Sequence, residues 1–174
     1  MAVQQRQSVS TRLLFLDIDG VMHSVDRVQA VHTGTGTEYT GDRLFEHLPL
    51  LGRILDQCPD VSVIISSAWR DVYTLSELQK FFGGWGHRVI GTTLSIDALD
   101  SMPANRFREC QMVAERLGVS DWLVVDDQPG IVWGSQIPKP PLARRVFWCD
   151  PVLGLATPLV ATGIVRRFLD GETR

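Results

Sequence analysis

The chain has 174 residues, 44% of them hydrophobic, which is enough for one domain with a substantial core and too little for two ordinary domains. Its formal net charge of −3 excludes the broad basic surface that proteins binding nucleic acids or membranes usually carry. Cys58, Cys110 and Cys149 are scattered and show no C-x-x-C spacing, which argues against a disulfide framework or a structural zinc site and indicates a reducing, cytoplasmic setting.

Apolar runs alternate with helical patterns along the chain, which is typical of βα units. Residues 1–11 are polar, and we expect them to lead into a single domain that spans 1–174. No apolar run is long enough to cross a bilayer. The alternation predicts an α/β fold, namely a three-layer sandwich with a mostly parallel, Rossmann-like sheet. In chain order, we expect a strand over 12–19, a helix over 41–58, a strand over 61–67, a helix over 74–86, a strand over 87–93, a helix over 105–118, strands over 121–127 and 145–150, and a helix over 157–171.

The helix predictions depend on apolar spacing and on signals at the helix ends. Within 41–58, leucines recur at intervals of four, three and four from Leu44 onward, which places them on one helical face, and Pro49 is tolerated near the first turn. Thr74 and Glu77 have the spacing of a capping box.

Two polar or proline-rich stretches, 24–41 and 128–143, interrupt the alternation and are expected to be loops. Both follow the acidic ends of predicted strands. In an open parallel sheet the carboxyl ends of the strands form the edge where ligands bind. We therefore expect both stretches to border a site.

Carboxylates and hydroxyls gather at the ends of the predicted strands. In a parallel sheet the ends of the first, second and fourth strands converge, and carboxylates held together there would repel one another unless a cation neutralised them. A set of oxygen ligands favours a hard cation, and Mg²⁺ is the expected cofactor. The residues concerned are Asp17 and Asp19, Ser66 and Ser67, and Asp126 and Asp127; Asp150 follows the last strand.

Three segments carry a family resemblance: FLDIDGVMH (15–23), VIISSAWR (63–70) and WLVVDDQPG (122–130). Together they resemble the haloacid dehalogenase (HAD) superfamily of phosphohydrolases, whose first motif is D-x-D at the end of the first strand. The match looks closest to the HAD domain of "Swiss army knife" RNA repair proteins, and it extends from about Leu13 to Leu155. The resemblance implies a HAD-like sheet and a phosphatase activity.

The resemblance implies that Asp17 is the nucleophile that attacks phosphorus and becomes an aspartyl phosphate. Asp19 would protonate the leaving oxygen and then deprotonate the water that hydrolyses the intermediate. The spacing suits these roles, because residues i and i+2 of an extended segment face the same side. Gly20 would let the backbone turn away from the crowded site.

The remaining motif residues are assigned by the same resemblance. Ser66 would bind a phosphoryl oxygen, and Arg106 would be the cation of the third motif, with Arg108 as the alternative. The Mg²⁺ ligands would be the Asp17 side chain, the Asp19 main-chain carbonyl, and Asp126 or Asp127; the sequence leaves open which of the last two binds directly. Substrate contacts are further expected from Ser67, Arg70, Gly20 and His23.

The gaps between the motifs are too short for an inserted cap domain, so by analogy the site is open. We expect a Mg²⁺-dependent phosphatase that acts on a phosphorylated nucleic-acid end, a nucleotide or a small phosphate ester, with a second subunit as a conceivable lid. A phosphate-sensing or partner-binding module without turnover, and a phosphotransferase, are the alternatives. An EF-hand is excluded because Val21 and Val28 stand where it needs ligands, and a receiver domain is disfavoured because the D-D pair follows the fourth strand instead of the first.

Overall fold

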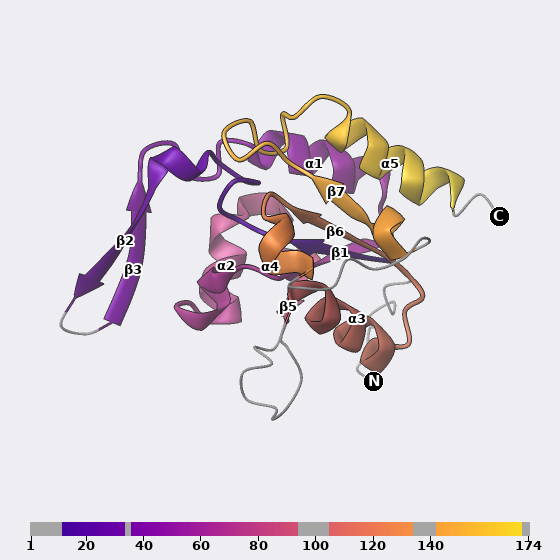
Figure 1. Ribbon diagram of the computed structural model, residues 1–174, viewed down its shortest axis with the longest axis horizontal. Helices are drawn as coiled ribbons and strands as arrows, with labels where there is room; N and C mark the ends of the chain where they lie inside the picture. The colour runs from indigo at the N-terminus through magenta and orange to yellow at the C-terminus, as the bar shows by residue number, and fades with distance from the viewer. Residues whose placement is uncertain (1–11, 34–35, 94–104, 134–141, 172–174) are drawn as a thin grey trace, which may run out of the picture.

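The computed structural model describes residues 12–33, 36–93, 105–133 and 142–171 (Figure 1). The predicted lead-in, 1–11, lies outside these ranges. Within them, five parallel strands form one sheet in the order β5-β4-β1-β6-β7, and two antiparallel strands form a separate hairpin, β2-β3. The strands are β1 (Arg12–Leu16), β2 (Val28–Thr33), β3 (Gly36–Gly41), β4 (Val61–Ile65), β5 (Val89–Thr92), β6 (Asp121–Asp126) and β7 (Val146–Trp148). The helices are α1 (Leu48–Gln57), α2 (Leu75–Phe81), α3 (Arg106–Leu117), α4 (Pro129–Trp133) and α5 (Val160–Asp170).

The central strand, β1, is buried on both faces, which explains its unbroken apolar sequence. Leu14 and Leu16 pack into a core with α1, α2 and α5 on one face of the sheet. Leu13 and Phe15 point to the other face, where they pack with α3 and α4. The predicted three-layer α/β sandwich with a parallel sheet is thereby confirmed.

The stretch 24–41 is not a loop as predicted. Most of it forms the β2-β3 hairpin, which extends away from the main sheet (Figure 1). Its register pairs Val28 with Gly41 and Thr33 with Gly36. The described side chains of β3 alternate between exposed and half-buried without a buried face, so the strand shows no apolar alternation in its sequence.

Two helices begin later than the apolar pattern predicted. α1 begins at Leu48 instead of residue 41, because Arg43 and Phe45 have positive φ angles that no helix accommodates. Pro49 then lies in the first turn, where its missing N–H costs no hydrogen bond. α5 begins at Val160, after Leu159 with a φ of 69°.

The start of α2 was predicted more accurately than its end, because the helix ends at Phe81 instead of residue 86 and a 3-10 helix over Gly83–Arg88 follows. The capping box of Thr74 and Glu77 is present at the start of α2. The proline-rich stretch 128–143 begins with a short helix, α4, and its residues 134–141 lie outside the described ranges.

The described residues contain no large cap domain: between β1 and β4 lie only the hairpin, one 3-10 turn and α1. The carboxyl edge of the sheet is therefore covered by no second domain within these ranges. No helix among them has the length and apolar content that crossing a membrane requires.

Candidate active site

The ends of the three central strands lie side by side. Leu16 of β1 pairs with Ile65 of β4 and with Val125 of β6, so the next residues, Ser66 and Asp126, flank Asp17. Backbone hydrogen bonds continue the ladder past Leu16, since the Ser66 N–H donates to Leu16 O at 2.9 Å and the Asp17 N–H to Val125 O at 3.0 Å. The predicted convergence of the first, second and fourth strand ends is confirmed.

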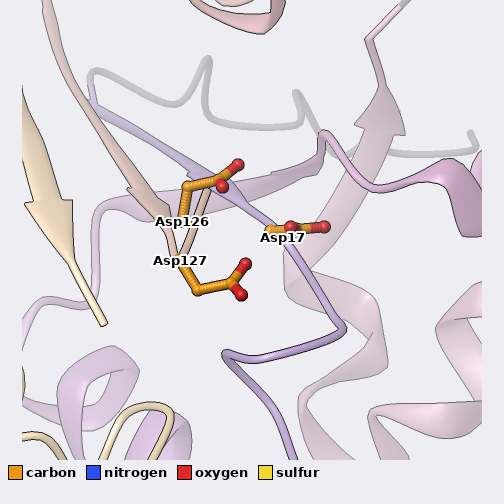
Figure 2. A group of neighbouring side chains, drawn as sticks. All are labelled: Asp17, Asp126 and Asp127. Carbon is orange, nitrogen blue, oxygen red and sulfur yellow. The ribbon is translucent and has the colours of Figure 1, made fainter. Parts of the chain in front are cut away.

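Asp17, Asp126 and Asp127 form an acidic cluster at this edge (Figure 2). Each offers one carboxylate oxygen, and these oxygens all lie within 4.8 Å of one another. Asp17 and Asp126 are buried, and Asp127 is half-buried. Three carboxylates at such separations suit a shared cation.

Arg106 enters the cluster from the first position of α3. The side chain of Asn105 caps this helix by accepting from the Arg108 N–H at 2.8 Å, which fixes where the helix begins. The Arg106 Nη1 donates to Asp17 Oδ2 at 2.7 Å and to Asp126 Oδ2 at 2.6 Å. Arg108 is exposed and contacts Gln111 instead. Of the two arginines considered for the third motif, Arg106 is therefore the one that reaches Asp17.

Burial and mutual repulsion govern the charges of the cluster. Burial raises the pKa of Asp17 above its ordinary value, although the Arg106 guanidinium opposes this. Burial and then the Asp17 charge raise the pKa of Asp126 to about 7 and that of Asp127 to about 6. Burial disfavours the charged form of Arg106, but the neighbouring carboxylates outweigh this and raise its pKa. The single guanidinium of Arg106 therefore neutralises only part of the negative charge that the three carboxylates carry when ionised.

Asp127 is the member of the cluster with an unused oxygen. Its buried Oδ1 accepts no hydrogen bond from the described part of the chain, whereas Asp126 uses Oδ2 for Arg106 and Oδ1 for the Gln128 N–H at 2.8 Å. Gly20 makes room for Asp127, because a Cβ at position 20 would lie 2.4 Å from the Asp127 carboxylate. Its φ of 71° is also one that glycine adopts without strain. Gly20 therefore has a steric reason to be glycine, beside its predicted place at the substrate.

The two serines after β4 differ in their hydrogen bonds. The Ser67 hydroxyl donates to the Asp17 carboxylate and accepts from the Trp69 N–H at 3.4 Å. The Ser66 Oγ is fully buried and has no hydrogen-bond partner among the residues that the structure describes. A buried hydroxyl without a partner costs free energy, so a group that accepts its proton would be bound favourably here.

Asp19 lies beside the cluster and is partly exposed, with 23% of its side-chain surface accessible. Its carboxylate contacts His23 at 3.1 Å and the indole of Trp69 at 3.0 and 3.1 Å. His23 is fully buried, with Asp19 on one ring nitrogen and the Phe45 N–H on the other. Its predicted substrate contact stays a prediction, and the structure gives it protein partners on both sides.

The comparison with protein families identifies the family to which this chain belongs. Residues 13–160 match the model of the HAD domain in Swiss Army Knife RNA repair proteins. The chain belongs to this family. A search of curated proteins and a search of solved structures each found no match. The buried Asp17, Asp126 and Asp127 cluster agrees with the catalytic site that HAD membership implies.

Arg70 of this HAD domain bonds to groups that surround the acidic cluster. Its Nη1 donates to Ser66 O at 2.9 Å and to Thr93 Oγ1 at 2.8 Å, and its Nη2 pairs with Glu109 Oε2 at 3.1 Å. These bonds tie the end of β4 to the residue after β5 and to α3. The substrate contact predicted for Arg70 stays a prediction, beside its evident part in holding Ser66.

Sequence reasoning missed the parts played by Glu109, Trp69 and Tyr39. Glu109 lies one turn from Arg106, so the R-x-x-E spacing places both on one face of α3, where one reaches the cluster and the other anchors the helix. Trp69 follows an apolar run, which indicates a packing role, and its indole N–H also donates to Asp19. Tyr39 lies in the stretch 24–41, which was expected to be a loop bordering the site, but no sequence signal singled out this residue.

Glu109→Gln is expected to lower the free energy of unfolding by about 3 kcal/mol, because it removes the buried carboxylate that pairs with Arg70 at 3.1 Å and leaves this cation the exposed Asp71 at 3.9 Å. Chemical denaturation monitored by tryptophan fluorescence measures the change. Asp42→Asn is the matched control, since it breaks an exposed pair with Arg27 and should cost less than about 1 kcal/mol. Equal losses in the two variants would contradict the anchoring role of Glu109.

Proposed function

We propose that this HAD domain is a Mg²⁺-dependent phosphatase that hydrolyses phosphomonoesters through an aspartyl phosphate on Asp17. The observation that carries the proposal is the position of the Asp17 carboxylate. Asp17 and Asp126 both accept hydrogen bonds from Arg106, and Asp17 also accepts one from the Ser67 hydroxyl. Together with Asp127 they form a cluster that could hold a cation.

The donor set fits Mg²⁺, which prefers carboxylate and carbonyl oxygens and retains several waters. Asp17 and Asp127 would bind it directly, since the free Oδ1 of Asp127 is the oxygen left available in the D-D pair. Asp126 would support the site from its bond with Arg106. By the family resemblance, Asp19 adds its main-chain carbonyl. When bound, Mg²⁺ offsets the negative charge of the carboxylates and of the phosphoryl group.

In the first step, an oxygen of Asp17 forms a bond to phosphorus while the bond from phosphorus to the ester oxygen breaks. Asp19 donates its proton to that oxygen, and the alcohol leaves. In the second step, Asp19 takes a proton from water as the water attacks phosphorus, and Asp17 is released with inorganic phosphate.

The neighbouring residues bind the transferred group. Arg106 donates toward Asp17 and would neutralise the phosphoryl oxygens that gather charge during transfer. The Ser66 hydroxyl, which has no partner, would gain one in a phosphoryl oxygen. Ser67 already holds the Asp17 carboxylate and would orient it.

The family and the open edge support a proposal about the substrate class. The matched domain belongs to RNA repair proteins, which favours a phosphorylated nucleic-acid end over a nucleotide or a small phosphate ester. The described residues place no large cap over the strand ends, so a long substrate has access. The buried free cysteines support the proposed cytoplasmic location, because they form no disulfide.

The test is hydrolysis of 4-nitrophenyl phosphate with Mg²⁺ and after treatment with a chelator, followed by RNA and DNA oligonucleotides phosphorylated at the 3′ or the 5′ end. We expect turnover that requires Mg²⁺ and a preference for one kind of end. Transfer of phosphate to an added alcohol in place of water would identify a phosphotransferase. Binding of Mg²⁺ and phosphate without turnover on any substrate would favour the non-catalytic module.

A further inference from the structure

We infer that Trp69 and His23 are positioning residues that hold the Asp19 carboxylate for proton transfer to the leaving group, and that the β2-β3 hairpin secures Trp69 through Tyr39. The inference rests on the proposed phosphatase function. It concerns how the Asp19 carboxyl group is oriented toward the leaving group, which the spacing of the motifs does not address.

Two nitrogen donors hold the Asp19 carboxylate. The Trp69 indole N–H lies 3.0 Å from Oδ1 and 3.1 Å from Oδ2, and His23 Nε2 lies 3.1 Å from Oδ1. The Phe45 N–H donates to His23 Nδ1 at 3.3 Å, so the proton of a neutral imidazole is on Nε2, facing Asp19. Oδ1 thus receives two donors and Oδ2 one, which leaves Oδ2 as the oxygen that carries the proton.

Both donors are rigid because they are buried. Trp69 and His23 expose none of their surface to solvent. The rings of Tyr39, Phe45 and Phe81 contact the Trp69 ring, with centroids 4.7, 5.5 and 5.4 Å away. A side chain packed in this way keeps one rotamer, so the direction of its N–H is fixed before substrate binds.

Tyr39 connects the hairpin to this arrangement. Its ring stacks on Trp69 at an interplanar angle of 6°, and its backbone N–H donates to the Tyr73 hydroxyl at 3.0 Å. Burial, and then the charges of Asp19 and Asp71, raise the pKa of the Tyr39 phenol, which places it near the acid as well as on the indole. Tyr39 therefore connects the hairpin to the catalytic edge.

The chemistry gives these contacts a consequence. When Asp19 loses its proton to the ester oxygen, its carboxylate becomes negative while two fixed N–H groups point at it, and they stabilise that charge without reorganising. Loss of a donor misdirects the acid and slows the departure of poor leaving groups most. A good leaving group departs with little protonation and depends on the donors much less.

The experiment compares kcat/KM for 4-nitrophenyl phosphate, which has a good leaving group, with that for benzyl phosphate, which has a poor one, in native protein and in Trp69→Phe. We expect kcat/KM to fall at least about tenfold for benzyl phosphate and less than about threefold for 4-nitrophenyl phosphate. Trp85→Phe is the matched control, because it also removes an indole bond to a carboxylate, that of Asp56 at 3.1 Å, away from Asp19. It should leave both values unchanged. Equal losses on both esters in Trp69→Phe, or no loss, would overturn the inference.

A second pair of variants decides the question if Trp69→Phe does not fold. His23→Gln retains an amide N–H near the position of Nε2, whereas His23→Leu retains none. We expect kcat/KM for benzyl phosphate to fall in His23→Leu and to recover in His23→Gln. Tyr39→Leu should also lower kcat/KM more for benzyl phosphate than for 4-nitrophenyl phosphate, but to a smaller degree. Identical kinetics in the two His23 variants would contradict a positioning role. Native protein that hydrolyses neither ester would overturn the proposed function and this inference with it, whereas active native protein without the bias overturns the inference alone.

Discussion

Asp17→Asn is expected to reduce kcat by a factor on the order of 10⁴ or more, because an amide offers no anionic oxygen to attack phosphorus. Neither neighbouring carboxylate is expected to replace it, since Asp126 is held by both Arg106 and the Gln128 N–H, and Asp127 would be occupied by Mg²⁺. The measurement is steady-state hydrolysis of 4-nitrophenyl phosphate at saturating Mg²⁺. Native protein quenched during turnover should carry one phosphoryl group by mass spectrometry, and the variant none.

The fold should tolerate this change. An asparagine side chain is nearly isosteric with that of Asp17 and removes one negative charge from a cluster in which burial already disfavours ionisation, so the melting temperature should not fall. Asp150→Asn is the control: Asp150 also follows a strand, but its carboxylate accepts from the N–H groups of Val152 and Leu153 and lies outside the cluster. It should retain native activity. More than a tenth of native activity in Asp17→Asn would exclude Asp17 as the nucleophile.

The sheet could be predicted because each of its strands is encoded locally. β1 and β6 are buried on both faces and therefore appear as apolar runs, and each run ends where polar residues begin. The alternation with amphipathic helices then indicates parallel pairing without any knowledge of partners. The resemblance to the HAD superfamily led to the same fold independently.

The hairpin and the start of α1 could not be predicted because tertiary contacts decide them. β3 has no buried face, so its residues show neither apolar alternation nor an apolar run. Phe45 adopts a positive φ where its N–H reaches His23, a residue 22 positions away. The leucine spacing in 41–58 gives no sign of the positive φ at Phe45 or of its contact with His23.

The candidate site likewise has one part that the sequence predicts and another part that depends on tertiary contacts. Asp17, Asp126 and Asp127 lie at strand ends, so the sequence brings them together as soon as the sheet is parallel. The choice of Asp127 as the oxygen available to a metal depends on which hydrogen bonds its neighbour makes. Motif spacing identifies the residues that react, and packing identifies the residues that hold them.

The metal-free protein is expected to lose stability as pH rises from about 4 to about 7. Burial and the Asp17 charge raise the folded pKa of Asp126 to about 7 and that of Asp127 to about 6, above the ordinary value of 3.8. Between these values the folded state binds more protons than the unfolded state, so the free energy of unfolding decreases with rising pH. Since one pKa unit corresponds to about 1.4 kcal/mol, the shift of Asp126 alone should lower the free energy of unfolding by roughly 4 kcal/mol, and the more exposed Asp127 should add a smaller decrease.

Urea denaturation at a series of pH values measures this slope, with a chelator present throughout. Asp126→Asn should flatten it most, because Asp126 has the larger pKa shift, and Asp127→Asn should flatten it in part.

Mg²⁺ should stabilise the native protein more at pH 8 than at pH 5, because at low pH protons compete for the same oxygens. If Asp127 is the direct ligand, its asparagine variant should bind Mg²⁺ at least about tenfold more weakly and lose most of that stabilisation, while Asp126→Asn loses less. A stabilisation by Mg²⁺ that is independent of pH, or unchanged in Asp127→Asn, would show that the ion does not bind at this cluster.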